Sequence, residues 1–241
     1  MSKNVFDISN ELMSNAYPGR GIIFGRTLDN KQNVVAYFIM GRSENSRNRI
    51  FVETEDGIRT QAYDPSKMTD PSLIIYHPVR QCGDKLVVTN GDQTDTICEY
   101  LREGKSYIDA LRTRQFEPDA PNYTSRISGV INEDGSYSLS ILKNFTSDRT
   151  SNKRFFYEYD KPVPGLGHFI HTYQCDGDPL PPFRGEPKCI RIEKPIKQFT
   201  EMLWTSMNEQ NKVALFVRYI DLATGAYWQE IRNKHEEGKN A

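Results

Sequence analysis

The sequence has no long apolar run, no excess of charge of one sign and no closely spaced cysteines. Its longest strongly apolar run covers seven residues, 34–40, far below the roughly 20 residues that a membrane-spanning helix needs. The 31 basic and 32 acidic side chains leave a formal charge of −1, whereas nucleic acids and anionic membranes favour strongly basic surfaces. We therefore expect no membrane segment and no nucleic-acid partner.

Cysteine is sparse, and its spacing fits no known framework. Cys82, Cys98, Cys175 and Cys189 are separated by 16, 77 and 14 residues, which gives no C-x-x-C pair and no zinc-ribbon pattern. The N-terminus lacks the apolar segment of a signal peptide, which favours a cytoplasmic location, where thiols stay reduced. We therefore expect four free thiols and no disulfide framework.

The sequence also lacks the common motifs for cofactors and metals. It contains no Walker A, G-x-S-x-G or H-E-x-x-H motif, and Gly19, Gly21 and Gly25 are spaced wrongly for a dinucleotide fingerprint. His168 and His171 lie in a strand-like segment, where residues three apart point to opposite faces. The sequence thus predicts no cofactor and no metal site.

Hairpin patterns dominate the chain after a short helix predicted over 5–16. Apolar segments flank turn residues at four places, pairing 21–25 with 34–40, 50–52 with 58–63, 73–79 with 85–88, and 126–131 with 137–142. Helical spacing predicts helices over 92–103, 107–116 and 196–210, and further strands are expected at 155–159, 168–173, 213–221 and 227–228. Hairpins with helices in blocks indicate an α+β fold with a largely antiparallel sheet.

A single domain of 1–241 fits this pattern, because 241 residues can bury a core of ordinary size. We expect residues 1–17 to form an N-terminal helical extension and the charged residues 232–241 to form a frayed tail. Pro179–Pro182 reads as a loop inserted between strands.

The stretch from Tyr17 to Phe51 contrasts with the balanced charge of the whole chain. It holds six basic residues, five of them arginine, against two acidic ones, a local charge of +4. The planar guanidinium of arginine suits bidentate binding of phosphate or carboxylate. These residues indicate a small-anion site, and the alternative is a solvated basic loop.

Residues 87–97 form a second candidate segment, a strand that runs into the N-terminus of a helix. Helix N-termini bind anions through their unpaired N–H groups and the helix dipole. Asp92 and Asp95 also fit an ordinary N-cap and first-turn pair that needs no ligand. Both interpretations stay open.

Several short blocks together resemble the archaeal-type inosine monophosphate (IMP) cyclohydrolase family. They are Gly19–Arg26, Ala36-Tyr37, Gly41–Ser43, Asn48-Arg49, Ile75–Arg80, and Asn90–Ile97, with weaker matches at Phe116-Glu117, Asn122–Arg126 and Thr172–Gln174. The resemblance covers short blocks within 19–175. The helix before Pro18 and the Pro179–Pro182 loop look like additions to the family pattern.

The resemblance implies a four-layer αββα sandwich similar to N-terminal-nucleophile hydrolases, without their self-processed nucleophile. It also implies ring closure of 5-formamido-imidazole-4-carboxamide ribotide (FAICAR) to IMP with loss of water, the last step of purine synthesis, in a cytoplasmic homo-oligomer that uses no cofactor. Two alternatives stay open: a catalytically silent protein that binds purine nucleotides, and another amidohydrolase on the same scaffold.

Ring closure needs a donor for the formyl oxygen and an acid/base group near the carboxamide. We assign Tyr76 as donor or proton shuttle, Glu117 as acid/base and Arg42 as electrostatic stabiliser. The candidate residues for the phosphate, ribose and base are Arg26, Arg47, Asn48, Arg49, Asn90, Gly91, Thr94, Asp95 and Arg126. The alternatives are a packing role for Tyr76 and a solvated helix-end position for Glu117.

Overall fold

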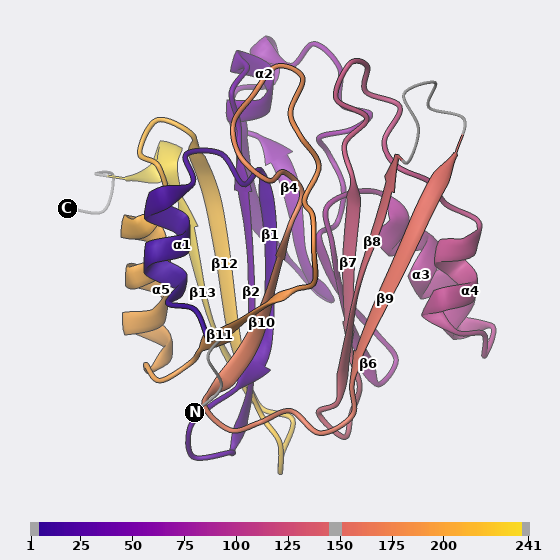
Figure 1. Ribbon diagram of the computed structural model, residues 1–241, viewed down its shortest axis with the longest axis vertical. Helices are drawn as coiled ribbons and strands as arrows, with labels where there is room; N and C mark the ends of the chain where they lie inside the picture. Colours follow the sequence, from indigo (N-terminus) through magenta and orange to yellow (C-terminus); the bar gives the residue numbers. More distant parts are fainter. Residues whose placement is uncertain (1–4, 145–150, 238–241) are drawn as a thin grey trace.

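Two antiparallel sheets carry helices on their outer faces (Figure 1). The computed structural model describes residues 5–144 and 151–237. The six-stranded sheet has the order β11 (Lys188–Arg191), β10 (Leu166–His171), β1 (Arg20–Arg26), β2 (Gln32–Met40), β12 (Lys212–Asp221) and β13 (Tyr227–Asn233). The seven-stranded sheet runs β3 (Arg49–Thr54), β4 (Gly57–Ala62), β5 (Val79–Cys82), β6 (Lys85–Thr89), β7 (Arg126–Ile131), β8 (Tyr137–Asn144) and β9 (Asn152–Tyr159).

The helices lie in separate groups on the two sheets. Figure 1 shows α1 (Ile8–Ser14) and α5 (Ile196–Ser206) against the six-stranded sheet, and α3 (Gln93–Arg102) and α4 (Tyr107–Arg112) against the seven-stranded sheet. The short α2 (Glu44–Arg47) and the 3-10 turns Pro65–Lys67 and Lys234–Glu236 complete the described elements. No helix among the described residues has the length and apolar character required to cross a bilayer.

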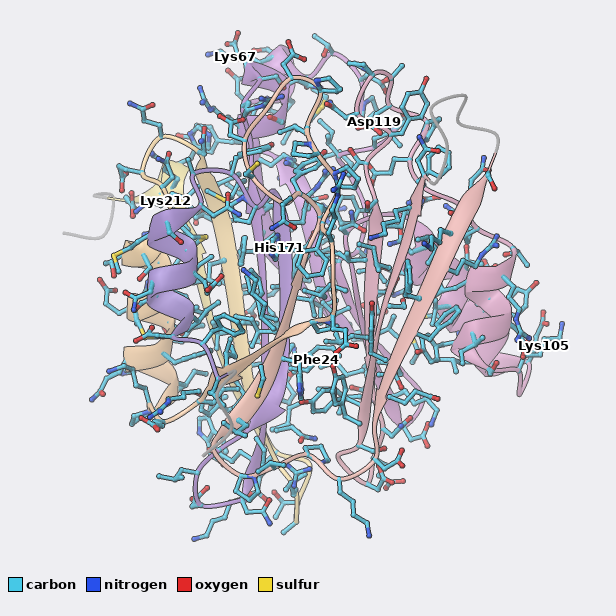
Figure 2. The ribbon with its side chains drawn as sticks, in the orientation of Figure 1. Phe24, Lys67, Lys105, Asp119, His171 and Lys212 are labelled. Carbon is cyan, nitrogen blue, oxygen red and sulfur yellow. A yellow bond between two sulfur atoms is a disulfide. The ribbon has the colours of Figure 1, made fainter. Side chains whose placement is uncertain are left out.

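The central strands carry apolar side chains on both faces, because one face packs against the other sheet and the opposite face packs against helices. In β1, Ile22 and Phe24 point into the core between the sheets, while Ile23 points toward α1 and α5. Figure 2 shows Phe24 in the space between the two sheets. A third apolar cluster, which includes Val87 and Leu111, packs α3 and α4 on the other sheet. Three cores therefore hold the layers together.

The four predicted hairpins are confirmed as antiparallel pairs. The third is shorter than expected: its first strand begins at Val79 rather than Leu73. Pro78 has no N–H for a ladder, and Tyr76 instead bonds to Thr60, whose hydroxyl oxygen accepts from the Tyr76 N–H at 2.8 Å. The sequence interpretation did not include β11.

The predicted tail is ordered for most of its length, contrary to expectation. β13 continues through Asn233, whose side chain accepts a hydrogen bond from the Phe51 N–H and donates one to the Phe51 carbonyl. Asn233 thereby joins the edges of the two sheets, and a 3-10 turn follows it. Residues 238–241 and 1–4, parts of the predicted tail and N-terminal extension, lie outside the described residues.

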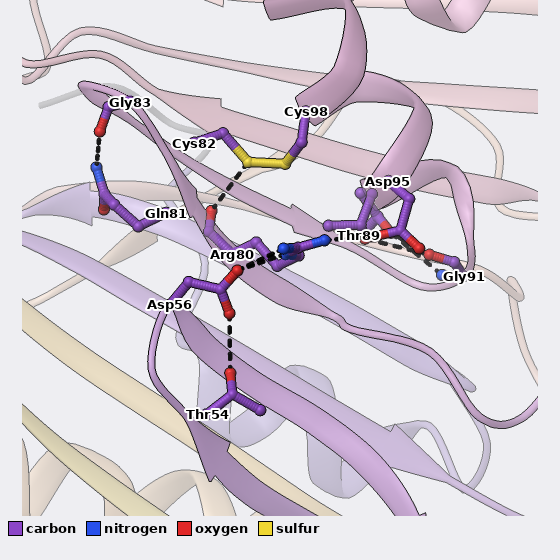
Figure 3. The surroundings of a disulfide bond; sticks show 11 residues. Thr54, Asp56, Arg80, Gln81, Cys82, Gly83, Thr89, Gly91, Asp95 and Cys98 are labelled. Carbon is purple, nitrogen blue, oxygen red and sulfur yellow. Dashed lines mark hydrogen bonds and ion pairs between the residues drawn. A yellow bond between two sulfur atoms is a disulfide. The ribbon is translucent and has the colours of Figure 1, made fainter. Parts of the chain in front are cut away.

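The expectation of four free thiols is wrong. Cys82 on β5 and Cys98 on α3 form a disulfide with Cα atoms 5.4 Å apart, while Cys175 and Cys189 are free. Figure 3 shows the disulfide next to Arg80, which pairs with Asp56 and with Asp95 of α3. The cysteine spacing could not reveal this pair, because only the packing of α3 across β5 brings the sulfurs together.

We expect reduction of the disulfide to destabilise the protein. It closes a loop of 16 residues, for which the loss of chain entropy in the unfolded state corresponds to about 3 kcal/mol. Urea unfolding with and without reductant measures the difference, and Cys175→Ser, at an exposed free thiol, should keep the same sensitivity. Four titratable thiols in the denatured, unreduced protein would contradict the pairing.

Candidate active site

A cavity of about 340 Å³ opens at the end of the sandwich where α2 lies. This volume is within the usual range for small-molecule sites, roughly 300–1,000 Å³. Its walls come from loops at the ends of both sheets: Tyr17, Arg20, Met40, Arg42, Ser43, Asn45, Ser46, Arg49, Asp70, Leu73, Ile74, Glu117, Asp119, Asn122, Tyr173 and Leu180. Figure 2 shows Asp119 at this end of the molecule. Leu180 belongs to the predicted inserted loop, which thus forms part of the wall.

A larger cavity, of about 530 Å³, opens at the opposite end among the hairpin turns. Its described walls contain none of the catalytic or substrate-binding residues predicted from the sequence. The smaller cavity brings together three of them, Arg42, Arg49 and Glu117. We therefore take the smaller cavity as the candidate active site.

Glu117 is the central charged group of this cavity. It is only 1% exposed, which rules out the solvated interpretation. One oxygen lies 3.5 Å from Arg20 Nη2, and the other, Oε1, has no hydrogen-bond partner within the described part of the chain. Burial raises the pKa of Glu117 to about 7, against the opposing charges of Arg20, Arg126 and Arg49. A carboxyl group with this pKa can take up and release a proton near neutral pH.

Arg20 and Arg49 place two guanidinium groups beside Glu117. Arg20 begins β1 and Arg49 begins β3, so each sheet contributes one of them. Arg49 is 1% exposed, and its pKa is lowered by burial and further by the charge of Arg20. Two cations near one carboxylate leave a net positive charge, which favours an anionic or electron-rich ligand.

Tyr76 is buried and is not among the described residues of the cavity wall. Its hydroxyl lies 2.8 Å from the hydroxyl of Tyr37 on β2. Tyr37 is fully buried, and burial raises its pKa well above the ordinary value. Tyr37 therefore remains a phenol and can donate its proton to Tyr76. The packing alternative for Tyr76 stays open.

Arg42 lies at the mouth of the cavity rather than at its floor. Its guanidinium donates to Asp176 Oδ1 at 2.8 Å and to the Gly177 carbonyl at 2.9 Å, and it stacks over Tyr17 at 5.3 Å. Its side chain is 37% exposed, so water screens its charge more than that of Arg49.

Gly91 brings the second predicted segment close to Glu117. A Cβ atom placed on Gly91 would lie 3.4 Å from Glu117 Oε1 and 2.6 Å from Arg126 Nη1, so a side chain here would force Arg126 to shift. Arg126 is itself held by Gln93 Oε1 at 2.6 Å and by Asp92 at 2.7 Å. Asp92 makes no side-chain cap of α3; it pairs with arginines instead.

Two other residues of this segment make structural contacts. The Asn90 side chain donates to the Ser125 carbonyl and accepts from the Ile127 N–H. The Thr94 hydroxyl bonds to Thr89 Oγ1 at 2.6 Å. Asn90 and Thr94 are completely buried and lie outside the cavity wall.

Four predicted site residues lie away from the cavity. Arg26 shares the inter-sheet face of β1 with Arg20 but lies six residue steps further along the strand, about 20 Å at roughly 3.3 Å per step. The Arg26 guanidinium donates to the Gly135 carbonyl. Arg47 donates to the Gly41 carbonyl and to Asn211. Asn48 bonds to the backbone of Asp64, and Asp95 pairs with Arg80.

The sequence assignment omitted Arg20, Asp119 and Tyr173. Arg20 was visible within the basic stretch, and its place in the Gly19-Arg20-Gly21 block was the available signal. Tyr173 and Asp119 meet through Thr124, whose hydroxyl lies 2.5 Å from the Tyr173 hydroxyl and also contacts Asp119. Tyr173 likewise lay in the Thr172–Gln174 block, whereas no sequence signal pointed to Asp119. Among the described residues no group of His, Cys, Asp and Glu could hold a metal ion.

Comparison with known proteins gives a consistent result. Residues 17–225 match the family described as IMP cyclohydrolase-like protein, which extends beyond the blocks within 19–175. An IMP cyclohydrolase of Methanococcus aeolicus is 28% identical over 166 residues, covering 66% of this chain and 75% of the relative. An IMP cyclohydrolase of Methanopyrus kandleri is 27% identical, and the match covers 65% of this chain and 75% of the relative. One of Methanococcus maripaludis is 33% identical over 126 residues, which cover 50% of this chain and 61% of the relative.

We expect Glu117 to make stability depend on pH. The pKa in the folded state, about 7, exceeds the ordinary 4.5, so the folded protein binds more protons between these values. The stabilising contribution is complete below pH 4.5 and is lost as the pH rises through 7. The unfolding free energy of the wild type minus that of Glu117→Gln should fall by up to about 3 kcal/mol between pH 4 and 8. Urea titrations measure this difference, and a constant difference would contradict the shift.

Proposed function

The chain belongs to the IMP cyclohydrolase-like protein family, and we propose that it closes the ring of FAICAR to form IMP and water. The observation that carries this proposal is Glu117, a buried carboxyl group with a pKa of about 7, held beside two arginines at the wall of a nucleotide-sized cavity. The proposal is also supported by relatives named IMP cyclohydrolase, whose sequences are 28–33% identical to this chain over half to two-thirds of its length.

Ring closure forms one C–N bond and releases one water molecule. The carboxamide nitrogen attacks the formyl carbon, and negative charge develops on the formyl oxygen. That oxygen then leaves as water, carrying one proton from the carboxamide nitrogen and one from the formamido nitrogen. The reaction therefore has two requirements. One is a group that transfers protons, and the other is a positively charged group beside the formyl oxygen.

Glu117 is suited to the proton transfers. Its raised pKa lets the carboxylate accept the proton of the attacking nitrogen and the resulting acid return it to the departing oxygen. Arg126, held next to Gly91, would keep Glu117 in place.

The burial of the arginines reverses two roles expected from the sequence. Charge stabilisation is strongest where water is excluded, which favours the buried Arg49 over the half-exposed Arg42. Arg42 at the mouth, with the hydroxyl groups of Ser43 and Ser46 in the same wall, is better placed for the 5′-phosphate. Arg26, Arg47, Asn48, Asn90, Thr94 and Asp95 have no direct part in this proposal.

Tyr76 completes the proposed machinery as a proton donor to the formyl oxygen. If Tyr37 donates to Tyr76 across their 2.8 Å contact, the proton of Tyr76 is free for the substrate. The neighbouring Arg20 and Arg49 would stabilise negative charge on either oxygen.

The proposal extends to the fold, the oligomeric state and the location of the protein. The two sheets with outer helices support an αββα sandwich like that of N-terminal-nucleophile hydrolases. A single domain, a homo-oligomeric state and a cytoplasmic location stay predictions from the resemblance and the sequence.

Incubation with FAICAR should yield IMP, and the absorbance of IMP measures its formation. The kcat/KM should rise with pH up to about 7 and then level off, because the base must be ionised. Glu117→Gln should lower kcat by at least about 100-fold and abolish this rise. Nucleotide binding without turnover would favour the silent protein, whereas neither binding nor turnover would favour another amidohydrolase.

Tyr76→Phe tests the proton donor against the packing role. Loss of a group that acts in the transition state should lower kcat by about 100-fold while KM changes by less than about threefold. Tyr219→Phe is a matched control, because the Tyr219 hydroxyl donates to the Lys194 carbonyl and neither residue is among the described lining of the cavity. An unchanged kcat in Tyr76→Phe would remove Tyr76 from the mechanism.

A further inference from the structure

The C-terminal residues Asn233–Glu237, here called the C-terminal clamp, reach α2, which forms part of the cavity wall. His235 Nε2 lies 2.9 Å from the carbonyl oxygen of Arg47, the last residue of α2. Because a carbonyl oxygen only accepts hydrogen bonds, Nε2 carries the proton and donates. The family match ends at residue 225, so the clamp lies beyond the segment that this chain shares with the family model.

The helix α2 depends on contacts from outside itself. It is four residues long, and helices shorter than about 12 residues are marginal without tertiary contacts. None of its residues is buried, so no apolar core anchors it. The carbonyl groups at the C-terminal end of a helix also lack partners within the helix. The bond from His235 supplies one of these partners, as basic side chains near helix C-termini commonly do.

The clamp can support α2 because it is itself held on both sides of His235. Before it, Asn233 exchanges two hydrogen bonds with the backbone of Phe51. After it, Glu237 accepts a hydrogen bond from Trp204 Nε1 of α5. These contacts join the clamp to the edge strand of the seven-stranded sheet and to a helix on the six-stranded sheet.

A ring contact adds to the hydrogen bond. The His235 imidazole stacks on Tyr63, with ring centroids 4.3 Å apart and an interplanar angle of 8°. The Tyr63 N–H donates to the carbonyl of Asn48, the residue directly after α2. His235 thus contacts the end of α2 and also the residue bonded to the segment that follows it.

The position of α2 determines the position of several groups in the cavity wall. Ser43, its N-cap, accepts from the Ser46 N–H at 3.1 Å. The Ser46 carbonyl in turn accepts from Arg49 Nε at 2.8 Å. All three residues line the cavity, so a displacement of α2 would move both hydroxyl groups and disturb Arg49.

We infer that His235 is a positioning residue for the phosphate end of the cavity, because its hydrogen bond to α2 holds Ser43 and Ser46 in place. This inference rests on the proposed function, in which these hydroxyls and Arg42 bind the 5′-phosphate. His235 is not among the described residues of the cavity wall, so it acts through α2.

The test compares ligands with and without the phosphate. Calorimetry would measure binding of IMP and of inosine, which lacks the 5′-phosphate, to the wild type and to His235→Ala. The variant should bind IMP about tenfold more weakly, the usual effect of one lost hydrogen bond, and inosine within about twofold of the wild type. The KM for FAICAR should rise about tenfold while kcat changes by less than about threefold, because phosphate binding is equal in the ground and transition states.

Two further variants separate the hydrogen bond from general effects. His235→Gln should bind IMP within about threefold of the wild type, because its amide N–H can donate to the same carbonyl. Arg232→Ala removes a cation from the preceding strand, where Arg232 pairs with Glu230, and should match the wild type. Hydrogen exchange at the amides of Arg47 and Asn48, which close the hydrogen bonds of α2, should be faster in His235→Ala than in Arg232→Ala.

Several outcomes would overturn the inference: equal losses of affinity for IMP and inosine, unchanged IMP binding in His235→Ala, an equal loss in Arg232→Ala, or IMP binding by His235→Gln as weak as by His235→Ala. The proposed function fails separately, if IMP binding follows the expected pattern but FAICAR gives no IMP. Turnover with unaltered IMP binding in His235→Ala would instead remove only the positioning role. A wild type that neither binds IMP nor converts FAICAR would overturn both.

Discussion

The candidate site depends on one buried carboxylate surrounded by arginines. Glu117 is almost completely buried, and Arg20, Arg49 and Arg126 approach it from strands of both sheets. A buried carboxylate without cations would be too costly to ionise, whereas a tight bidentate pair would keep it permanently ionised. The long 3.5 Å contact with Arg20 leaves the balance between these extremes, where the pKa of Glu117 falls near neutral pH.

The two-sheet architecture makes this arrangement possible. Arg20 begins a strand of one sheet, and Arg49 and Arg126 begin strands of the other, so the ends of the sheets meet around the segment that carries Glu117. That segment is fixed by its own contacts, since the Glu117 N–H donates to the Thr124 carbonyl at 2.8 Å. The large cores behind the site hold the strands rigid, and rigid elements position charged groups more precisely than loops do.

Much of the fold could be predicted from local patterns. The turn residues between apolar runs located all four hairpins, because turn chemistry and alternation act over a few residues. Prediction was weaker where partners are distant. The late start of β5 at Val79 depends on the contact of Tyr76 with Thr60, and the order of residues 232–237 depends on Asn233 joining the Phe51 backbone. The disulfide likewise needed the placement of α3 across β5.

The sequence by itself determined the α+β class, the arginine-rich stretch and the residues that resemble the IMP cyclohydrolase family. It named Glu117 as a candidate but could not show which arginines lie near it. Arg20 and Arg26 lie on the same face of one strand, yet only Arg20 lines the cavity, and Arg47 points to Asn211 while Arg49 points inward. Only the tertiary structure decided these positions, because burial and distance depend on which strand ends meet, and that is set by long-range packing.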